Sequence, residues 1–283
     1  MRAPALLLAV PLLAAAAWCA DASDACRVTP RAPPGAASLL GGFTALAVQV
    51  LWMRADVAMT ELREDDAQLA FAAIGELEPQ LVSASDYIAR ALGFTMARGH
   101  KEPAVRWALA REGWRVLCRT VERNPGEARA FAARGRYALL RVNGDPAMRD
   151  GFLRDVDRAG PLEAARRDYE EALRLRPQWR EPWDGVALAS LGRGVEELAE
   201  RGAFEAAGPL FRRAAEAFGH VVALLREDGD PLLAGNLAAC EDQSRLAAAL
   251  ASACAAPAAE RPARYEDVRA RFAGAELPPL APR

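Results

Sequence analysis

The stretch "DYEEALRLRP", residues 168–177, decides the fold because its spacing returns elsewhere in the chain. Counting back from Pro177, the small Ala172 stands five positions earlier, the large Tyr169 eight earlier and the small Ala165 twelve earlier. Residues at these intervals share one face of a helix. Proline ends such a helix, because it has no N–H to donate and disfavours helical backbone in the residue before it. The stretch predicts a helix with a small–large–small packing face, closed by proline.

The same spacing occurs three more times. The equivalent residues are Ala67, Phe71 and Ile74 before Pro79; Gly113, Leu117 and Thr120 before Pro125; and Ala207, Phe211 and Ala214, which no proline closes. Small residues let neighbouring helices approach, and the large residue fills the space between successive repeats. The chain is therefore expected to stack several helices through equivalent faces.

These faces resemble the second helix of the tetratricopeptide repeat, which carries small, aromatic and small residues at the same intervals before a proline. Matching first helices are found as well: residues 181–192 place Trp183 where that repeat favours tryptophan, and residues 127–140 place Gly135 where it needs a small residue. The resemblance implies an all-α fold, a right-handed α-solenoid of antiparallel helix pairs.

The chain departs from the standard repeat in length. Its closing prolines, Pro79, Pro125 and Pro177, stand 46 and 52 residues apart, whereas the standard period is about 34. Much of the surplus falls in residues 143–161, so the repeats are lengthened and degenerate. The stretch "LLGGFTALAVQVLWMRADV" at 39–57 with "ELEP" at 76–79 is similar to N-terminally anchored, expanded-repeat proteins of planctomycete-like and deltaproteobacterial genomes. That resemblance implies an architecture and no particular activity.

Composition supports a helical protein and excludes one class of partner. Hydrophobic residues make up 52% of the 283 and charged residues 26%, which is enough to bury a sizeable core. Helix-favouring Ala, Leu, Arg and Glu dominate, which favours an all-α fold. The formal net charge is −2. The basic footprint of a nucleic-acid-binding protein is therefore missing, and no nucleic acid is expected as a partner.

The N-terminus has the pattern of an export segment. Arg2 precedes an uncharged run over residues 3–20, as in a signal peptide. Two alternatives stay open: cleavage after Ala22, within "ADA", or an uncleaved membrane anchor formed by residues 3–20. Either one exports the remainder to the periplasm or cell envelope. The expected organisation is a signal or anchor at 1–22, a proline-rich linker at 23–37, repeats at 38–253, and a short helix with a proline-rich tail at 254–283.

No motif requires catalysis. Phosphate-binding loops, zinc signatures and nucleophile elbows are missing from the sequence, and the five cysteines have no ligand spacing, so neither a cofactor nor a metal is expected. "GHKE" at 99–102 combines potential acid–base groups, but a solvated loop is the preferred interpretation. Trp107 and Trp114, seven residues apart, are interpreted as core residues rather than as a ligand platform.

These observations favour a non-enzymatic scaffold of the cell envelope, which binds a partner protein or peptide in the concave groove lined by first helices. The expected contact residues are Arg90, Arg129, Arg136 and Asp184. Arg129 and Arg136, two helical turns apart, are expected to clamp carboxylates of the partner. Two alternatives remain: an envelope hydrolase or wall-glycan lyase, and a structural subunit that packs its first helix against a membrane complex. An enzyme needs a cleft with a buried, perturbed carboxylate.

Overall fold

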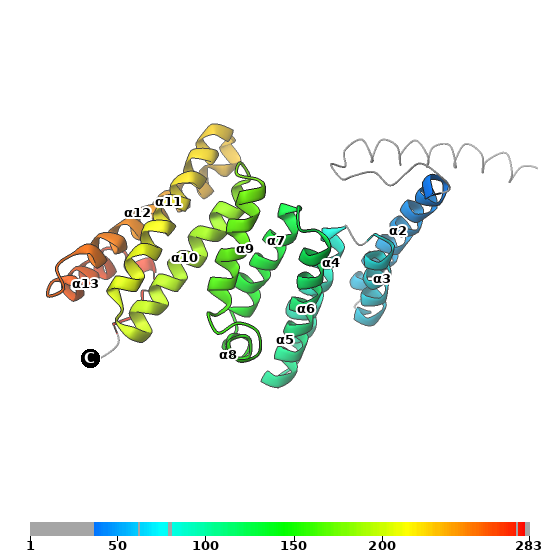
Figure 1. Cartoon of the computed structure of the whole chain (residues 1–283), viewed down its shortest axis with the longest axis horizontal. Coiled ribbons are helices and arrows are strands. Elements are labelled where there is room, and N and C mark those ends of the chain that lie inside the picture. The colour runs from blue at the N-terminus through cyan, green and yellow to red at the C-terminus, as the bar shows by residue number, and fades with distance from the viewer. Residues whose placement is uncertain (1–36, 62, 79–80, 276, 281–283) are drawn as a thin grey trace, which may run out of the picture. The chain divides into compact units, whose positions relative to one another are not determined.

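A computed structural model describes residues 37–61, 63–78, 81–275 and 277–280, and every regular element in these ranges is helical (Figure 1). The expected all-α class is confirmed for this part of the chain. The chain divides into two compact units, one ending at Ile88 and one beginning at Ala89. The predicted signal or anchor at 1–22 and all but the last residue of the linker lie outside the described residues.

The first unit is built on a helix pair, α2 (Ala37–Thr60) and α3 (Glu64–Leu77), which is followed by the start of α4 (Val82–Arg90). Its core gathers three rings: the Phe71 centroid lies 5.2 Å from that of Trp52 and 4.0 Å from that of Tyr87. Ile74 beside them is fully buried. The unit thus has a core of its own.

The second unit is a succession of helices. Its elements are η1 (Ala91–Met96), α5 (Ala97–Gly99), α6 (Pro103–Arg123), α7 (Ala128–Arg136), η2 (Tyr137–Val142), α8 (Pro146–Asp155), α9 (Pro161–Leu175), α10 (Arg180–Arg201), α11 (Phe204–Asp228), η3 (Pro231–Leu233), α12 (Ala234–Ala255), α13 (Arg261–Arg271) and η4 (Ala273–Ala275). The segments η1 and η2 are π-helical, and η3 and η4 are 3₁₀ turns.

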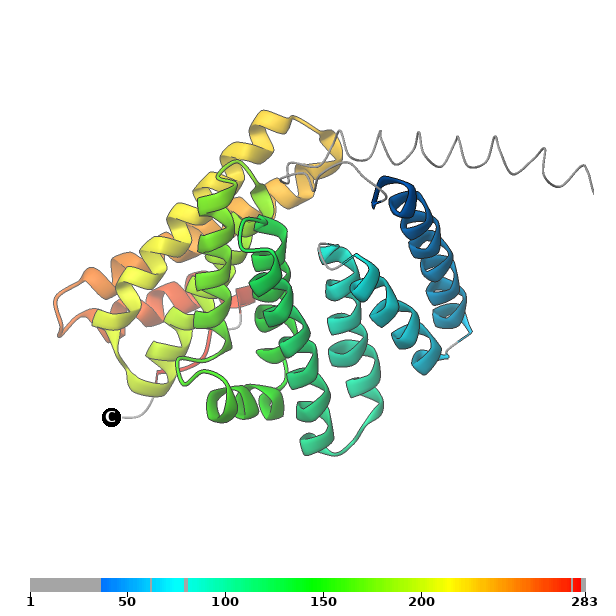
Figure 2. The same cartoon turned by 45° about the vertical axis from the view of Figure 1, so that its right-hand side comes forward.

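Each long helix of the second unit packs mainly on its neighbours in the chain. The main pairs are α6 with α7, α7 with α9, α9 with α10, α10 with α11, α11 with α12, and α12 with α13. Figures 1 and 2 show this succession from two directions. A further contact joins α7 to α10, the first helices of adjacent pairs. Contacts confined to near neighbours are typical of a helical repeat array.

The small–large–small residues form the interior of this packing, as expected. All twelve are buried: Ala67, Phe71, Ile74, Gly113, Leu117, Thr120, Ala165, Tyr169, Ala172, Ala207, Phe211 and Ala214. Tyr169 shows how they work. A Cβ atom added to Gly135 of α7 would lie 3.2 Å from the Tyr169 ring, and one added to Gly185 of α10 would overlap that ring. Tyr169 therefore fills the space between two first helices, which only glycines leave wide enough.

Two other aromatic residues use the same arrangement. Phe211 of α11 lies where a Cβ atom on Gly194 of α10 would come within 2.6 Å of it. Tyr137 occupies the space beside Gly93 and Gly113, and its hydroxyl donates a 2.9 Å hydrogen bond to the Ala110 carbonyl. Close packing of aromatic rings on glycine holds the array together at successive positions along the chain.

The 143–161 insertion is an ordered part of the core. Its helix, α8, places the Phe152 ring 5.0 Å from Trp114 and 6.5 Å from Trp107, between ring centroids. The Trp107 indole N–H donates a 2.7 Å hydrogen bond to Asp155. Both tryptophans are more than nine-tenths buried, which confirms their interpretation as core residues.

The C-terminal segment continues the packed array. The sequence predicts repeats over residues 38–253. In the structure α12 runs to Ala255, and α13 shares a core with α11 and α12. Tyr265 of α13 is almost fully buried there, and its hydroxyl donates a 2.7 Å hydrogen bond to the Pro278 carbonyl. Helix α13 therefore covers the last helix pair, together with Phe272, Leu277 and Leu280.

Candidate protein-interaction surfaces

One side of α7 and its continuation η2 carries exposed side chains. Gly135 points at α9, and at 100° per residue of an α-helix the side chains of Arg129 and Arg136 lie about a third of a turn away from it. Arg129 is exposed and Arg136 is half-buried. Leu140, in the π-helical η2, is 56% exposed. Arg129 and Leu140 are therefore accessible to a partner.

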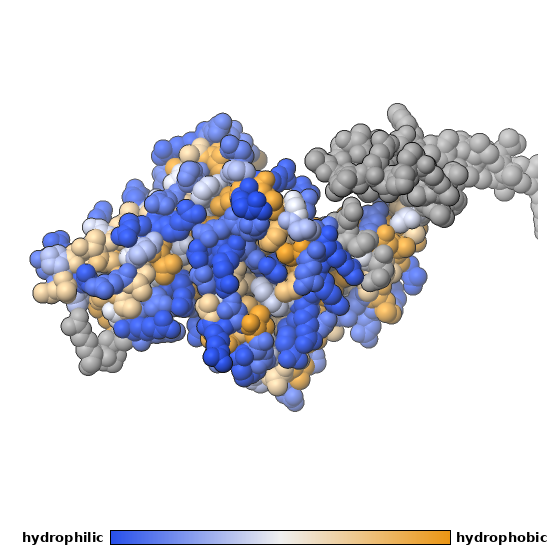
Figure 3. All heavy atoms as spheres, viewed as in Figure 1, coloured by the Kyte–Doolittle hydropathy of each residue, from blue (hydrophilic) through white to orange (hydrophobic). Residues whose placement is uncertain are grey.

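The neighbouring first helix, α10, continues this surface. Gly185 points at Tyr169, and Glu181, Asp184 and Leu188 lie to one side of it. Leu188 is 38% exposed. We call the six residues Arg129, Arg136, Leu140, Glu181, Asp184 and Leu188 the first-helix face. In the space-filling view the visible side of the second unit is largely hydrophilic, with smaller hydrophobic areas between the charged residues (Figure 3).

The expected arginine clamp is not formed by two free guanidinium groups. Arg136 Nη1 lies 2.5 Å from Glu181 Oε1, so Arg136 pairs with an acid of the next first helix. Arg129 is exposed on the same side of α7. Arg90 is exposed at the end of α4, and no described contact joins it to the other predicted residues. That Arg129 and Arg136 clamp carboxylates of a partner stays a prediction, and Arg136 would then exchange Glu181 of α10 for the partner's carboxylate.

Asp184 is half-buried on α10, and burial raises the pKa of its carboxyl while Arg180 opposes this. Leu140 and Leu188 were not among the predicted contact residues. A signal for them existed, because each stands four positions after a predicted residue, Arg136 or Asp184, and so on the same side of its helix.

Asp168 of α9 is buried, and it forms a two-pronged ion pair with Arg134 of α7, with N–O distances of 2.9 and 2.6 Å. The Arg134 guanidinium also lies 5.5 Å from the Trp114 ring centroid and 3.7 Å from the Cys118 sulfur, both on α6. Burial alone would lower the pKa of Arg134, but the hydrogen bonds and charge of Asp168 outweigh it and raise that pKa. The arginine stays charged and joins three helices.

The other buried carboxylate of the described residues is Glu197, which accepts hydrogen bonds from Arg193 at 2.7 Å and from Arg201 at 2.9 Å within α10. Both buried acids thus have arginine partners, and neither lines either of the two hollows described next. The half-buried Asp184 also lies outside both hollows. Among the described residues, these two hollows are therefore not lined by the buried carboxylate that the hydrolase alternative requires.

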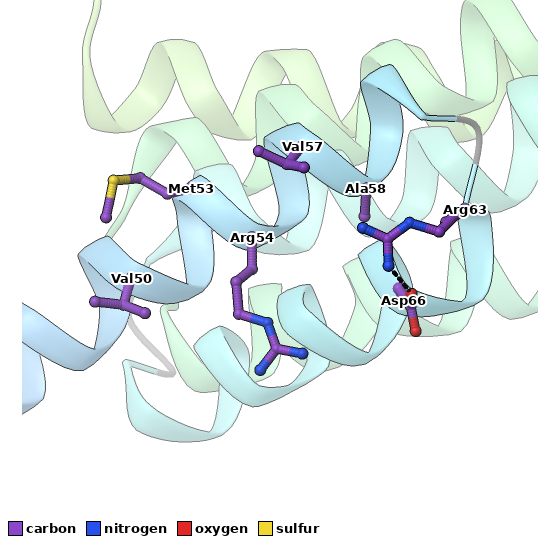
Figure 4. A pocket seen from close by; sticks show the side chains of 7 residues that line it. All are labelled: Val50, Met53, Arg54, Val57, Ala58, Arg63 and Asp66. Carbon is purple, nitrogen blue, oxygen red and sulfur yellow. Dashed lines mark hydrogen bonds and ion pairs between the residues drawn. The ribbon is translucent and has the colours of Figure 1, made fainter.

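Two open hollows mark the surface. The first, of about 300 Å³, lies between α2 and α3 (Figure 4) and is lined by Val50, Met53, Arg54, Val57, Ala58, Arg63 and Asp66. Arg63 closes one end through ion pairs with Asp66 and Glu61. The second, of about 500 Å³, lies beside α12 and the segment after α13, and Leu246 and Phe272 are among its lining residues. Neither hollow gathers acid–base groups around an unpaired carboxylate.

Cysteine and histidine chemistry is not concentrated anywhere in the described residues. Cys118, Cys240 and Cys254 are free thiols, and burial raises the pKa of Cys254 to about 11. Over residues 37–61, 63–78, 81–275 and 277–280 no three His, Cys, Asp or Glu side chains are grouped to hold a metal, and no helix has the length and hydrophobicity to cross a bilayer. His100, Lys101 and Glu102 are exposed, which fits the solvated loop.

Comparisons with known proteins add little to this geometry. No family model matches the chain, and no curated protein matches it. Among solved structures, the crystal structure of MamA protein aligns with a TM-score of 0.36 and 12% sequence identity, covering 83% of this chain and 98% of that one. At that level of similarity, the assignment of a helical repeat fold rests on the helix packing described above.

Proposed function

We propose that this chain is a non-enzymatic protein-interaction scaffold that binds a segment of a partner protein along the first-helix face. The observation that carries the proposal is the packing of Tyr169 between Gly135 and Gly185. Because this ring holds α7 and α10 side by side, their remaining sides form one pre-organised surface. Pre-organisation lowers the entropic cost of binding.

The composition of the first-helix face suits a protein partner. Leu140 and Leu188 supply exposed apolar area, and Arg129 and Asp184 supply charge beside it. Protein interfaces characteristically have an apolar centre within a polar rim. The pair between Arg136 and Glu181 is more than a third exposed on both sides, and such pairs contribute only about 0–1 kcal/mol. A charged group of a partner can therefore replace Arg136 or Glu181 in that pair at a small cost in free energy.

A site-specific crosslinking experiment tests the face. A photoreactive amino acid at position 140 or 188 is expected to capture a partner in cells, whereas the same group at position 174 is not. Arg174 of α9 serves as the matched control because its side chain is 65% exposed but outside the face. Equal capture at all three positions, or none at 140 and 188, would refute the assignment of the face.

We further propose that the chain acts outside the cytoplasm, by means of the uncharged run at 3–20. A C-terminal alkaline phosphatase fusion is then active, and a fluorescent fusion that matures only in the cytoplasm stays dark. The opposite pattern would contradict export. A carbonate wash separates the two remaining alternatives, because it releases the protein after signal cleavage and leaves an anchored protein in the membrane.

A further inference from the structure

A second charged surface lies where the two π-helical segments of the second unit meet. The Arg141 guanidinium of η2 is 5.3 Å from the Phe94 ring centroid of η1, and the Tyr137 and Phe94 centroids are 6.4 Å apart. A π-helical turn inserts an extra residue and re-aims the side chains around it, and such turns are frequent at functional sites. Here two of them face each other in adjacent first helices.

Positive charge at this junction is not balanced. Arg106 of α6 forms an ion pair with Asp145 at 3.1 Å and donates a hydrogen bond to the Lys101 carbonyl. Neither Arg98 of α5 nor Arg141 has an ion pair with any described residue. Burial lowers the pKa of Arg141, Asp145 opposes this, and the charges of Arg98 and Arg106 lower it further. Of these three arginines, only Arg106 has a close carboxylate partner among the described residues.

An unsatisfied donor marks the same place. The Arg141 Nε atom is buried and has no hydrogen-bond acceptor among the described residues. A buried polar group without a partner is unfavourable for folding, and arginine does not escape the cost by losing its proton. A ligand with carboxylate groups would satisfy the free donors and balance the charge.

We propose that Arg98, Arg106 and Arg141 bind an acidic peptide segment of a partner protein. This inference rests on the proposed scaffold function, since its occupant is a protein. The planar guanidinium fork matches a carboxylate in two-pronged geometry. A single-stranded nucleic acid fits less well, because such ligands stack on aromatic rings, and Arg141 already lies over the Phe94 ring.

Direct binding of a fluorescent hexaglutamate peptide tests the site. The double variant Arg98→Ala/Arg141→Ala is expected to bind the peptide about tenfold or more weakly than the wild type, since each charge-assisted hydrogen bond has a large effect on affinity. The double variant Arg115→Ala/Arg174→Ala removes the same charge from exposed positions of the same unit, outside both proposed surfaces, and is expected to change affinity by less than about twofold. Equal losses in both variants would mean attraction to net charge alone and would overturn the site.

A second variant keeps the test independent of folding. Arg141→Met retains most of the side-chain stem but removes the unbalanced charge, so its melting temperature is expected to equal or exceed that of the wild type while peptide binding falls. A lower melting temperature with unchanged peptide binding would make Arg141 a structural residue and refute the proposal. Tighter binding of an oligothymidine probe than of hexaglutamate would also refute it.

The two proposals fail in different ways. If crosslinking at positions 140 and 188 succeeds while Arg98→Ala/Arg141→Ala leaves peptide affinity unchanged, the scaffold function stands and the acidic-peptide site is wrong. If peptide binding depends on Arg98 and Arg141 but no partner is captured at 140 or 188, the arginine site stands and the first-helix face is wrong.

Discussion

Helices α2 and α9 belong to different units and differ in how their apolar residues are distributed around the helix. On α9 the apolar residues keep to one side, and the other side carries ion pairs such as those of Arg166 with Glu163 and Glu170. On α2 apolar residues surround the whole helix. Val48, Ala55 and Ala58 are buried, while the opposite side leaves four exposed: Leu46, Val50, Met53 and Val57.

The difference lies in how much of each helix its neighbours cover. Helix α9 packs its one apolar side on α7 and α10, and its polar outer side completes an amphipathic pattern. A helix that is apolar all round is typical of one with neighbours on more than one side. Stability in the second unit should therefore depend on particular aromatic and ionic contacts, whereas changes on the outer side of α2 should leave folding nearly unaffected.

The largest expected effect comes from emptying the space between α7 and α10. Tyr169→Ala should lower the free energy of unfolding by about 3–5 kcal/mol, because the helices on either side cannot close the cavity. The control is Leu69→Ala in α3, where Leu69 is 70% exposed. It should change the free energy of unfolding by less than about 0.5 kcal/mol. Urea unfolding followed by circular dichroism measures both. Similar midpoints for the two variants would contradict the role of Tyr169.

A somewhat smaller effect is expected from breaking the buried ion pair. Asp168→Asn leaves the Arg134 charge without its partner and should cost about 2–4 kcal/mol, less than for a fully buried pair because the Arg134 side chain is 21% exposed. Glu171→Gln disturbs the exposed pair with Arg174 and should cost less than about 0.5 kcal/mol. If both changes cost the same, Arg134 is not held in the geometry described.

The same substitution should have opposite signs in the two units. Gly185→Ala places a methyl group on the Tyr169 ring and should destabilise the protein by about 1–3 kcal/mol. Gly75→Ala in α3 meets open space and should stabilise it by about 0.5–1 kcal/mol, because alanine favours helix. Thermal unfolding of the two variants distinguishes them, and a gain in stability for Gly185→Ala would refute the close packing.

The smallest effect is expected from the ionisation of Tyr169. It is absent near neutral pH and is confined to alkaline solution. Burial raises the pKa of Tyr169 above its ordinary value of 10, with a further contribution from Glu181. Its stabilising contribution is therefore present in full below pH 10 and is lost as the pH rises, by about 1.4 kcal/mol per pH unit for this group. Tyr169→Phe should flatten that decline. If the urea midpoints of the wild type and of Tyr169→Phe depend on pH in the same way between pH 9.5 and 11.5, the burial of the hydroxyl is contradicted.

Much of the helix packing was predictable because it depends on short-range pattern. The spacing of Ala165, Tyr169 and Ala172 before Pro177 places three side chains on one face whatever surrounds the helix. The helices α3, α6 and α9 accordingly end just before the three prolines, and the predicted face residues are buried. The π-helical segments were not foreseen, since no local pattern distinguishes them from ordinary helix.

The candidate surfaces were less predictable. The sequence placed Arg129 and Arg136 on one side of a helix, and the structure agrees, but the acid that pairs with Arg136 lies 45 residues further along the chain. The cluster of Arg98, Arg106 and Arg141 also draws on three separate helical segments. Such groupings depend on which helices become neighbours and on how far one is shifted along the other.

Three arginines in eight residues of the same helical run illustrate the limit. Helical periodicity and apolar spacing are local properties, so they are readable from the chain: it stacks helices, and these arginines lie outside the small–large–small faces. The group that each arginine contacts, by contrast, is not determined by the neighbouring sequence. Arg134 meets buried Asp168, Arg136 meets exposed Glu181, and Arg141 meets the Phe94 ring and no acid of the described chain. An ion pair needs atoms within about 4 Å, and that distance is set by the combined packing of every side chain between the helices.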